Sequence, residues 1–310
     1  MSYFVNSIIG HAIGDAMGFP TEFCIRERLM VNPVTEMISC PVHGQPAGSW
    51  TDDTSMEVCT IESFIEKKYF DYNDIMKKWT EWLSDGKYSA NGVAFDVGRT
   101  CLRAIKNYTK GINPLNCGST SEKYNGNGSL MRILPVALYS FKKNLSENEI
   151  IKLTNELSSL THAHDTSKLG CYIYVRFIIS LLNGNTKEDA YKEIQNLNYA
   201  MYDLNSVEKY HRILKANIKD YKLNEIKSTG YIVDTLECAI WIVMNATNYR
   251  ETILVSTNIG NDTDTIGAIA GSIAGIIYGV EDIPKSWIDK LLRKDYLFNL
   301  CNRFENAIIL

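Results

Sequence analysis

Apolar residues recur at helical spacing along almost the whole chain, and this periodicity limits the fold more than any other feature. After Thr54, for example, Val58, Ile61 and Ile65 lie three or four residues apart, which places them on one face of a helix. Alternating runs joined by tight turns, which are typical of strands, are few. Further segments with helical spacing are 75–83, 150–160, 169–182, 236–244 and 266–280. The sequence therefore predicts an all-α, compact multi-helix fold.

No segment rich in glycine, serine or proline divides the 310 residues, and most of the seven prolines lie between the expected helices. We therefore expect residues 1–310 to form a single domain. Ser146 precedes Glu149 by three residues, a capping-box pattern that predicts a helix start. Residues 183–228 are more polar and rich in lysine, which is typical of either a helical excursion or a surface insertion.

Glycines follow a period of four in two parts of the chain, which places each set on one face of a helix. The two sets are Gly10, Gly14 and Gly18, and Gly267, Gly271, Gly275 and Gly279. Because glycine costs about 1 kcal/mol relative to alanine inside a helix, a repeated set indicates a tertiary constraint. Close approach of a second helix and close approach of a ligand both fit this pattern.

Charge and hydropathy argue against several classes of partner. The net charge is −4 with both signs mixed along the chain, so the basic surface typical of nucleic-acid binders is absent. The most apolar stretch, 266–280, is shorter than the about 20 residues that a membrane-spanning helix needs. Eight cysteines without a CxxC pair indicate reduced thiols, and residues 1–10 carry no basic signal-peptide region. We expect a cytoplasmic protein, and the absence of long heptads favours a monomer.

Two short acidic segments have the clearest chemical potential. Residues 51–54 read Thr-Asp-Asp-Thr and residues 262–265 read Asp-Thr-Asp-Thr, and each segment precedes an apolar helix. Hard divalent cations prefer such oxygen ligands, and two segments could hold two ions about 3.5–4 Å apart, as in binuclear hydrolases. Helix capping is the alternative, since Asp and Thr are favoured at helix starts. Capping does not account for adjacent Asp52 and Asp53, whose charges repel without a cation.

Two further segments could contact an anionic ligand. Residues 125–129 form a glycine-rich turn before a helix, where free N–H groups could hold a phosphate, although a plain turn is the alternative. His162 could bind a phosphate or a ribose, or it could be structural. His164 and Asp165 also fit an HD-type metal phosphohydrolase, for which an upstream histidine such as His11 or His43 would be a further ligand.

Taken in order, five segments make the chain resemble the ADP-ribosylglycohydrolase family. The segments are 10–23, 48–54, 95–98, 125–135 and 256–279. The pair Thr161-His162 lies where the family keeps a Thr-His pair, and the two Asp/Thr segments at this order and separation are the most specific match. The chain departs from the family at His164-Asp165, where His-Pro or Asp-Pro is more usual. The resemblance implies an all-helical fold with a binuclear centre of Mg²⁺ or Mn²⁺ ions.

The resemblance also implies roles for individual residues. Glu22 and Asp96 match catalytic carboxylates, and Asp96 matches the one that faces the guanidinium in arginine-directed members. The implied metal ligands are Thr51, Asp52, Asp53, Asp262, Asp264 and Thr265. The implied substrate-binding residues are Gly126, Asn127, Gly128, Ser129, His162 and Tyr231. Arg132 would offset the charge of the diphosphate.

Together these features predict a metal-dependent hydrolase that cleaves the glycosidic bond between ADP-ribose and a modified side chain. Arginine is the expected linkage because of Asp96, and the substrate is an ADP-ribosylated protein or a small conjugate. The roles of general acid and general base stay open between Glu22 and Asp96. Three alternatives also stay open: hydrolysis of serine-linked or other O-linked ADP-ribose, an HD-type phosphohydrolase, and a non-catalytic relative that binds ADP-ribose.

Overall fold

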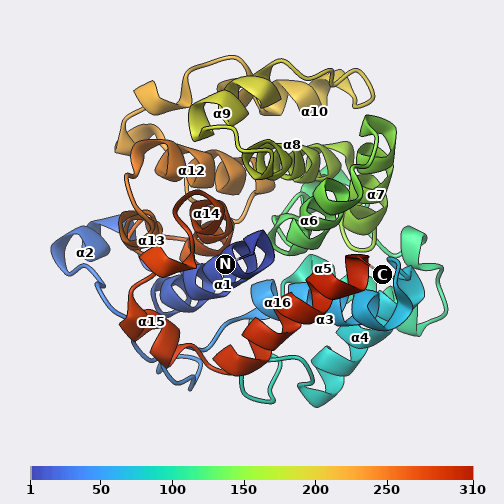
Figure 1. The fold of residues 1–310 in the computed structure, drawn as a ribbon, viewed down its shortest axis with the longest axis horizontal. Coiled ribbons are helices and arrows are strands. Elements are labelled where there is room, and N and C mark those ends of the chain that lie inside the picture. Colours follow the sequence, from blue (N-terminus) through green and yellow to red (C-terminus); the bar gives the residue numbers. More distant parts are fainter. Residues whose placement is uncertain (1, 310) are drawn as a thin grey trace.

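Helices surround a central helical pair in this protein, as Figure 1 shows for a computed structural model that describes residues 2–309. Within that range no strand longer than an isolated bridge occurs, so the all-α prediction is confirmed. The helices of the first half are α1 (Tyr3–Gly18), α2 (Arg26–Val31), α3 (Asp52–Lys67), α4 (Tyr72–Asp85), α5 (Arg99–Thr109), α6 (Leu134–Lys143) and α7 (Glu147–Ser159). Those of the second half are α8 (Asp165–Leu182), α9 (Lys187–Gln195), α10 (Leu204–Lys209), α11 (His211–Leu214), α12 (Ile232–Asn245), α13 (Tyr249–Thr257), α14 (Thr263–Tyr278), α15 (Lys285–Lys290) and α16 (Lys294–Ile309).

Every segment with helical spacing forms a helix, because its apolar face is buried against the rest of the molecule. The expected capping box is also present, since the Glu149 carboxylate accepts hydrogen bonds from the N–H and the hydroxyl of Ser146 at 2.8 Å and 2.6 Å. The apolar stretch 266–280 becomes α14, and no helix among residues 2–309 is both long and apolar enough to cross a membrane. All eight cysteines are free thiols, and only Cys24 is partly exposed.

The two glycine sets bring α1 and α14 into backbone contact. A Cβ atom on Gly14 would lie 1.9 Å from the carbonyl oxygen of Gly267, and one on Gly10 would lie 2.3 Å from that of Gly271. Residue numbers rise along one helix as they fall along the other, so the pair is antiparallel. Of the two explanations for the glycine period, close approach of a second helix is therefore correct for this face. This contact places the end of α1 beside the start of α14.

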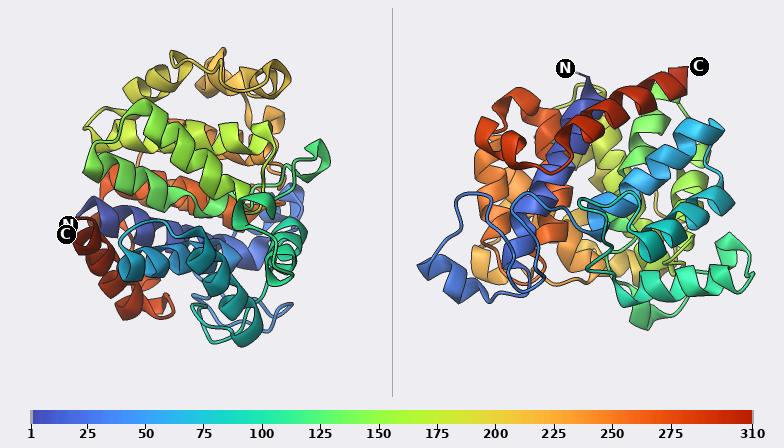
Figure 2. Two further views of the ribbon diagram at one scale, coloured as in Figure 1. Left: turned by 90° about the vertical axis from the view of Figure 1, so that its right-hand side faces the viewer. Right: turned by 90° about the horizontal axis from the view of Figure 1, so that it is seen from below.

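The remaining helices pack in layers on either side of this pair. On one side α16 and α3 lie against α1, and α4 covers α3; on the other side α12 and α13 lie against α14. Figure 2 shows the same layers from two further directions. One hydrophobic core extends through both sides and includes residues from Phe4 to Ile308. The single-domain organisation stays a prediction.

Residues 183–228 form a helical excursion rather than an irregular insertion. They contain α9, α10 and α11, which pack over α8 and α12 as the outermost layer at the top of Figure 1. Ala190 and Ile194 on α9 are fully buried in that contact. The lysine-rich composition of this segment is explained by its outer face, which remains in solvent.

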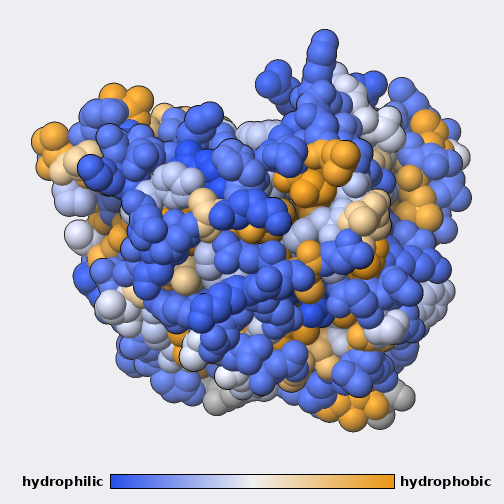
Figure 3. Space-filling view, turned by 90° about the horizontal axis from the view of Figure 1, so that it is seen from above, coloured by the Kyte–Doolittle hydropathy of each residue, from blue (hydrophilic) through white to orange (hydrophobic). Residues whose placement is uncertain are grey.

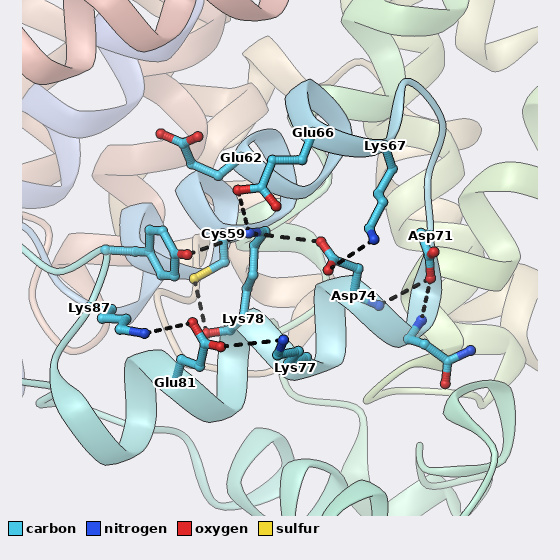
Figure 4. Close-up of polar contacts among 12 residues, drawn as sticks. Cys59, Glu62, Glu66, Lys67, Asp71, Asp74, Lys77, Lys78, Glu81 and Lys87 are labelled. Atoms are coloured by element: carbon cyan, nitrogen blue, oxygen red, sulfur yellow. Dashed lines mark hydrogen bonds and ion pairs between the residues drawn. The ribbon is translucent and has the colours of Figure 1, made fainter.

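Polar contacts hold α4 against α3, as Figure 4 shows. The Lys78 ammonium lies 2.8 Å from a Glu66 carboxylate oxygen and 3.8 Å from Asp74, and it is nearly buried. The Cys59 thiol donates to the Lys78 carbonyl at 3.7 Å. Since α3 begins with Asp52 and Asp53, these contacts help to fix the helix that carries the first acidic segment.

Candidate active site

Three helix ends meet around one cavity of about 430 Å³. The end of α1 lies beside the start of α14, since a Cβ atom on Gly18 would come within 2.2 Å of the Thr263 carbonyl oxygen. The start of α3 is held beside these two helix ends by hydrogen bonds to the Asp15 carboxylate of α1. The carboxylates that line the cavity are Glu22, Asp52, Asp53, Asp96, Asp262 and Asp264. The two acidic segments and both predicted catalytic carboxylates are therefore brought together.

Asp15 positions the first acidic segment. Its fully buried carboxylate accepts hydrogen bonds from the N–H of Thr51 at 3.0 Å and from the N–H and hydroxyl of Thr54 at 3.2 Å and 2.6 Å. It thus satisfies the free N–H groups at the start of α3 from a neighbouring helix. Asp52 and Asp53 lie in the turn held in this way. Asp15 was not predicted from the sequence, although a charged residue inside the apolar 10–18 stretch was a usable signal.

The second acidic segment is tied to the first and to the glycine-rich loop. The Thr265 hydroxyl lies 3.4 Å from Oδ1 of Asp53 and donates to it. The Asn127 amide donates to Oδ2 of Asp262 at 2.8 Å and to the Thr235 hydroxyl at 3.0 Å. Asn127 therefore links the loop before α6 to the start of α14, which supports its predicted place at the site.

Glu22 and Asp96 reach the cavity from strained loops. One carboxylate oxygen each from Glu22, Asp96 and Asp264 lie within 4.8 Å of one another. Asp96 has φ +57°, and Phe23, next to Glu22, has φ +58°. Backbone strain of this kind in non-glycine residues clusters at functional sites, where the surrounding structure maintains it. Here the Phe23 N–H donates to the Asn261 carbonyl at 2.7 Å and ties the loop of Glu22 to the loop before α14.

Burial and mutual repulsion strongly favour the protonated carboxyls when no cation is present. Burial, followed by the charge of Asp96, raises the pKa of Glu22 to about 10. Burial also raises the pKa values of Asp52, Asp53 and Asp264 well above their usual range. Buried oxygens of Glu22, Asp53 and Asp264 have no hydrogen-bond partner. A group of unpaired carboxylate oxygens fits a hard divalent cation.

These shifts predict a cation-dependent change of stability with pH. Folding raises the carboxyl pKa values, so the folded state binds more protons than the unfolded chain, and the free energy of unfolding falls as the pH rises above about 5. In EDTA we expect the melting temperature to drop between about pH 5 and pH 9. Saturating Mg²⁺ or Mn²⁺ should remove most of that drop, because a cation replaces the protons. The same pH dependence with and without cation would contradict a cation site.

The glycine-rich loop and His162 form a further part of the cavity wall, next to the second acidic segment. Gly126, Asn127, Gly128 and His162 all line the cavity. A Cβ atom on Gly128 would lie 2.7 Å from the Cys101 sulfur and 2.9 Å from Cε1 of His162, so only glycine fits there. Burial, followed by the charge of Arg132, lowers the pKa of His162 to about 3. His162 is therefore neutral at physiological pH and offers hydrogen bonds rather than charge.

The expectation that Arg132 offsets a diphosphate charge is wrong. Its guanidinium is fully buried, lies 4.2 Å from the Trp79 ring centre and donates to the Thr161 hydroxyl at 2.7 Å. That hydroxyl in turn lies 2.8 Å from Nδ1 of His162. Arg132 therefore fixes the Thr161-His162 pair from the side that does not line the cavity. The one Lys or Arg side chain among the described residues that line the cavity is Arg99, which no sequence signal had indicated.

Three predicted site residues lie behind or beside the cavity lining. The Thr51 hydroxyl accepts from the Asp53 N–H at 3.3 Å and is almost fully buried. Ser129 is fully buried and contacts the Cys171 sulfur at 3.4 Å. Tyr231 follows Gly230, which does line the cavity, and is paired through the backbone with Gly126. The roles of these three residues stay predictions.

The alternative that the chain is an HD-type metal phosphohydrolase, with His164 and Asp165 as metal ligands, is wrong. His164 caps α8, with Nδ1 accepting from the Thr166 N–H at 3.1 Å, and Asp165 lies 3.7 Å from Lys168. His11 is buried 3.4 Å from Glu57. None of these residues lines the acidic cavity among the described residues. An HD centre would require its histidines and aspartates to converge on one metal.

Comparisons with known proteins agree with this arrangement. The family model described as ADP-ribosylglycohydrolase matches residues 2–309. The chain is 35% identical to the ADP-ribosylarginine hydrolase Tri1 of Serratia proteamaculans over 96% of this chain and 77% of that protein. It is 28% identical to the ADP-ribosyl-(dinitrogen reductase) glycohydrolase of Rhodospirillum rubrum over 93% and 89% of the two chains. A solved structure titled ADP-ribosylglycohydrolase-related protein complex has a TM-score of 0.82 at 24% identity, covering 99% of this chain and 98% of that one.

Proposed function

The chain belongs to the ADP-ribosylglycohydrolase family, and on that premise we propose that it hydrolyses the bond between ADP-ribose and a modified arginine. The name of the Serratia relative supports the arginine linkage. The observation that carries the proposal is the convergence of Glu22, Asp96 and Asp264 beside Asp52 and Asp53 in one cavity.

The acidic segments are proposed to hold two divalent cations, Mg²⁺ or Mn²⁺. The proposed ligands are Thr51, Asp52, Asp53, Asp262, Asp264 and Thr265. The buried, unpaired oxygens of Asp53 and Asp264 support this assignment, because an isolated carboxylate is costly to bury without a counter-charge. When bound, such ions polarise sugar hydroxyls and lower the pKa of a coordinated water.

The reaction requires water to add across the bond between ribose C1″ and the guanidinium nitrogen. A new C1″–O bond forms, the C1″–N bond breaks, and arginine leaves with a proton on its guanidine. Asp96 is proposed to face the guanidinium, since a carboxylate attracts this cation as it leaves. Glu22 is proposed to transfer the proton, because one of its half-buried carboxyl oxygens lies within 4.8 Å of an oxygen of Asp96. Oxocarbenium-like charge at C1″ would be stabilised by the same carboxylates.

The part of the wall that the glycine-rich loop and His162 form is proposed to bind the diphosphate and the adjoining ribose. Gly126 and Gly128 let a ligand approach the backbone, and the neutral His162 can donate or accept a hydrogen bond. Arg99, at the start of α5, supplies the positive charge that the buried Arg132 cannot. A diphosphate entering a cavity with six carboxylates needs such a counter-charge in addition to any cations.

The proposal is tested by release of ADP-ribose from an arginine-modified protein, with Mg²⁺ or Mn²⁺ and again with EDTA. A serine-modified protein is assayed alongside. We expect cation-dependent release from arginine. Release of ADP-ribose from the serine-modified protein alone would contradict the proposed role of Asp96 toward the guanidinium. Binding of ADP-ribose without release from either substrate would support a non-catalytic relative. A cytoplasmic monomer remains the expectation for the state of the protein.

A further inference from the structure

An exposed apolar strip runs from the mouth of the active-site cavity onto α2. Its members are Phe23, Ile25, Met30 and Val31, whose exposed fractions are 73%, 62%, 65% and 77%. Only Leu29 of the six residues in α2 is buried. Single exposed apolar side chains are ordinary, but large ones gathered within nine residues are typical of an interaction surface.

The strip is held rigidly, although it buries little apolar surface of its own. The Arg26 guanidinium donates to the carbonyls of Ile259, Leu223 and Ile226 at 2.6 Å, 2.7 Å and 2.9 Å. Beyond α2, Val34 and the Asn258 side chain exchange two hydrogen bonds of 2.8 Å. Polar contacts at both ends therefore present α2 in a fixed position, at the left edge of Figure 1. A surface held in advance loses little conformational freedom when it binds a partner.

The strip is continuous with the catalytic cavity and with two grooves beside α2. Phe23 lines the cavity and is nevertheless mostly exposed. Met30 and Leu223 line both grooves, one against α13 of about 500 Å³ and one toward Asn261 of about 560 Å³. Figure 3 shows hydrophobic atoms at the left edge of this face, on the side where α2 projects in Figure 1, and further groups near the centre and the right edge.

We propose that this strip docks the folded protein that carries the ADP-ribosyl group, so that the enzyme recognises apolar protein surface next to the modified arginine. The proposal rests on the function proposed above and names the part of the substrate outside the cavity. Any protein whose side chain enters the cavity must cover its mouth, where Phe23 lies. A second copy of this chain seated on the strip would cover Phe23 and obstruct the mouth, so a stable dimer over this surface would oppose turnover.

The test compares one variant on two substrates. Met30→Ser combined with Val31→Ser removes the two members of the strip that lie on α2, without altering any residue that lines the cavity. The substrates are a folded protein with ADP-ribose on a surface arginine, and free ADP-ribosylarginine. We expect kcat/KM for the modified protein to fall about tenfold through KM, and kcat/KM for ADP-ribosylarginine to stay within about twofold. The matched control is Leu204→Ser on the outer layer, where an equally apolar side chain is 81% exposed.

The outcomes separate the two proposals. If the unaltered protein cleaves neither substrate, the proposed function fails, and the docking proposal fails with it. If it cleaves ADP-ribosylarginine but the double variant loses both activities equally, the strip supports the cavity structurally and the docking proposal is overturned. No loss on the modified protein also overturns it. A concentration-dependent dimer that the double variant abolishes would assign the strip to a second copy instead.

Discussion

Asp264→Ala should abolish hydrolysis of ADP-ribosylarginine, by at least about a thousandfold in kcat/KM, while the protein stays folded. Asp264 is the residue at which the proposed cation ligands and the proposed catalytic carboxylates meet, since one of its oxygens lies within 4.8 Å of one oxygen each of Glu22 and Asp96. Its Oδ1 is buried without a partner.

The same substitution should leave the cation-free protein as stable as before, or more stable. Burial and the charges of Glu22 and Asp53 raise the pKa of Asp264, so this carboxyl opposes folding when no cation is bound. We would measure kcat/KM together with the melting temperature in EDTA and in Mn²⁺. Asp189→Ala is the matched control, because Asp189 also lies in a first helical turn, that of α9, but is exposed. Near-normal activity of Asp264→Ala with cation present would refute the site.

Asp15→Ala should both destabilise the protein and disable the site, although Asp15 does not line the cavity. The carboxylate holds two backbone N–H groups and one hydroxyl at the start of α3, and all of these groups are buried. Leaving them without partners should lower the free energy of unfolding by about 3 kcal/mol. The turn that carries Asp52 and Asp53 would then lose its fixed geometry, so we expect cation affinity and kcat to fall together.

Two further variants distinguish positioning from a general loss of stability. Asp15→Asn keeps one carbonyl acceptor and should retain most of the fold with weaker cation binding. Thr54→Val removes a single hydroxyl from the same carboxylate and should cost about 1 kcal/mol. The measurements are denaturant unfolding and the Kd for Mn²⁺ in the absence of substrate. An unchanged Kd for Mn²⁺ in a folded Asp15→Ala protein would show that the first turn of α3 keeps its geometry without this contact.

Most side chains of the site could be predicted from residue types and from the order of the segments along the chain. Nine of the predicted side chains line one cavity: Glu22, Asp52, Asp53, Asp96, Asn127, His162, Asp262, Asp264 and Thr265. Arg132 was misjudged because its charge indicates a ligand contact in the sequence, whereas Trp79 and Thr161 enclose it in the fold. Arg99 was missed because an exposed arginine carries no signal until its helix is placed beside a cavity.

The sequence by itself determined the helices with clear apolar spacing, the glycine faces of α1 and α14, and the two Asp/Thr segments. These features depend on neighbours within one or two helical turns, where periodicity and capping act. Only the tertiary structure decided which of these groups meet. Thr265 and Asp53 are 212 positions apart, and they come together because backbone contact between Gly14 and Gly267 sets the two helix ends side by side. Burial of Arg132 and exposure of Phe23 follow from the same long-range packing, which no local pattern contains.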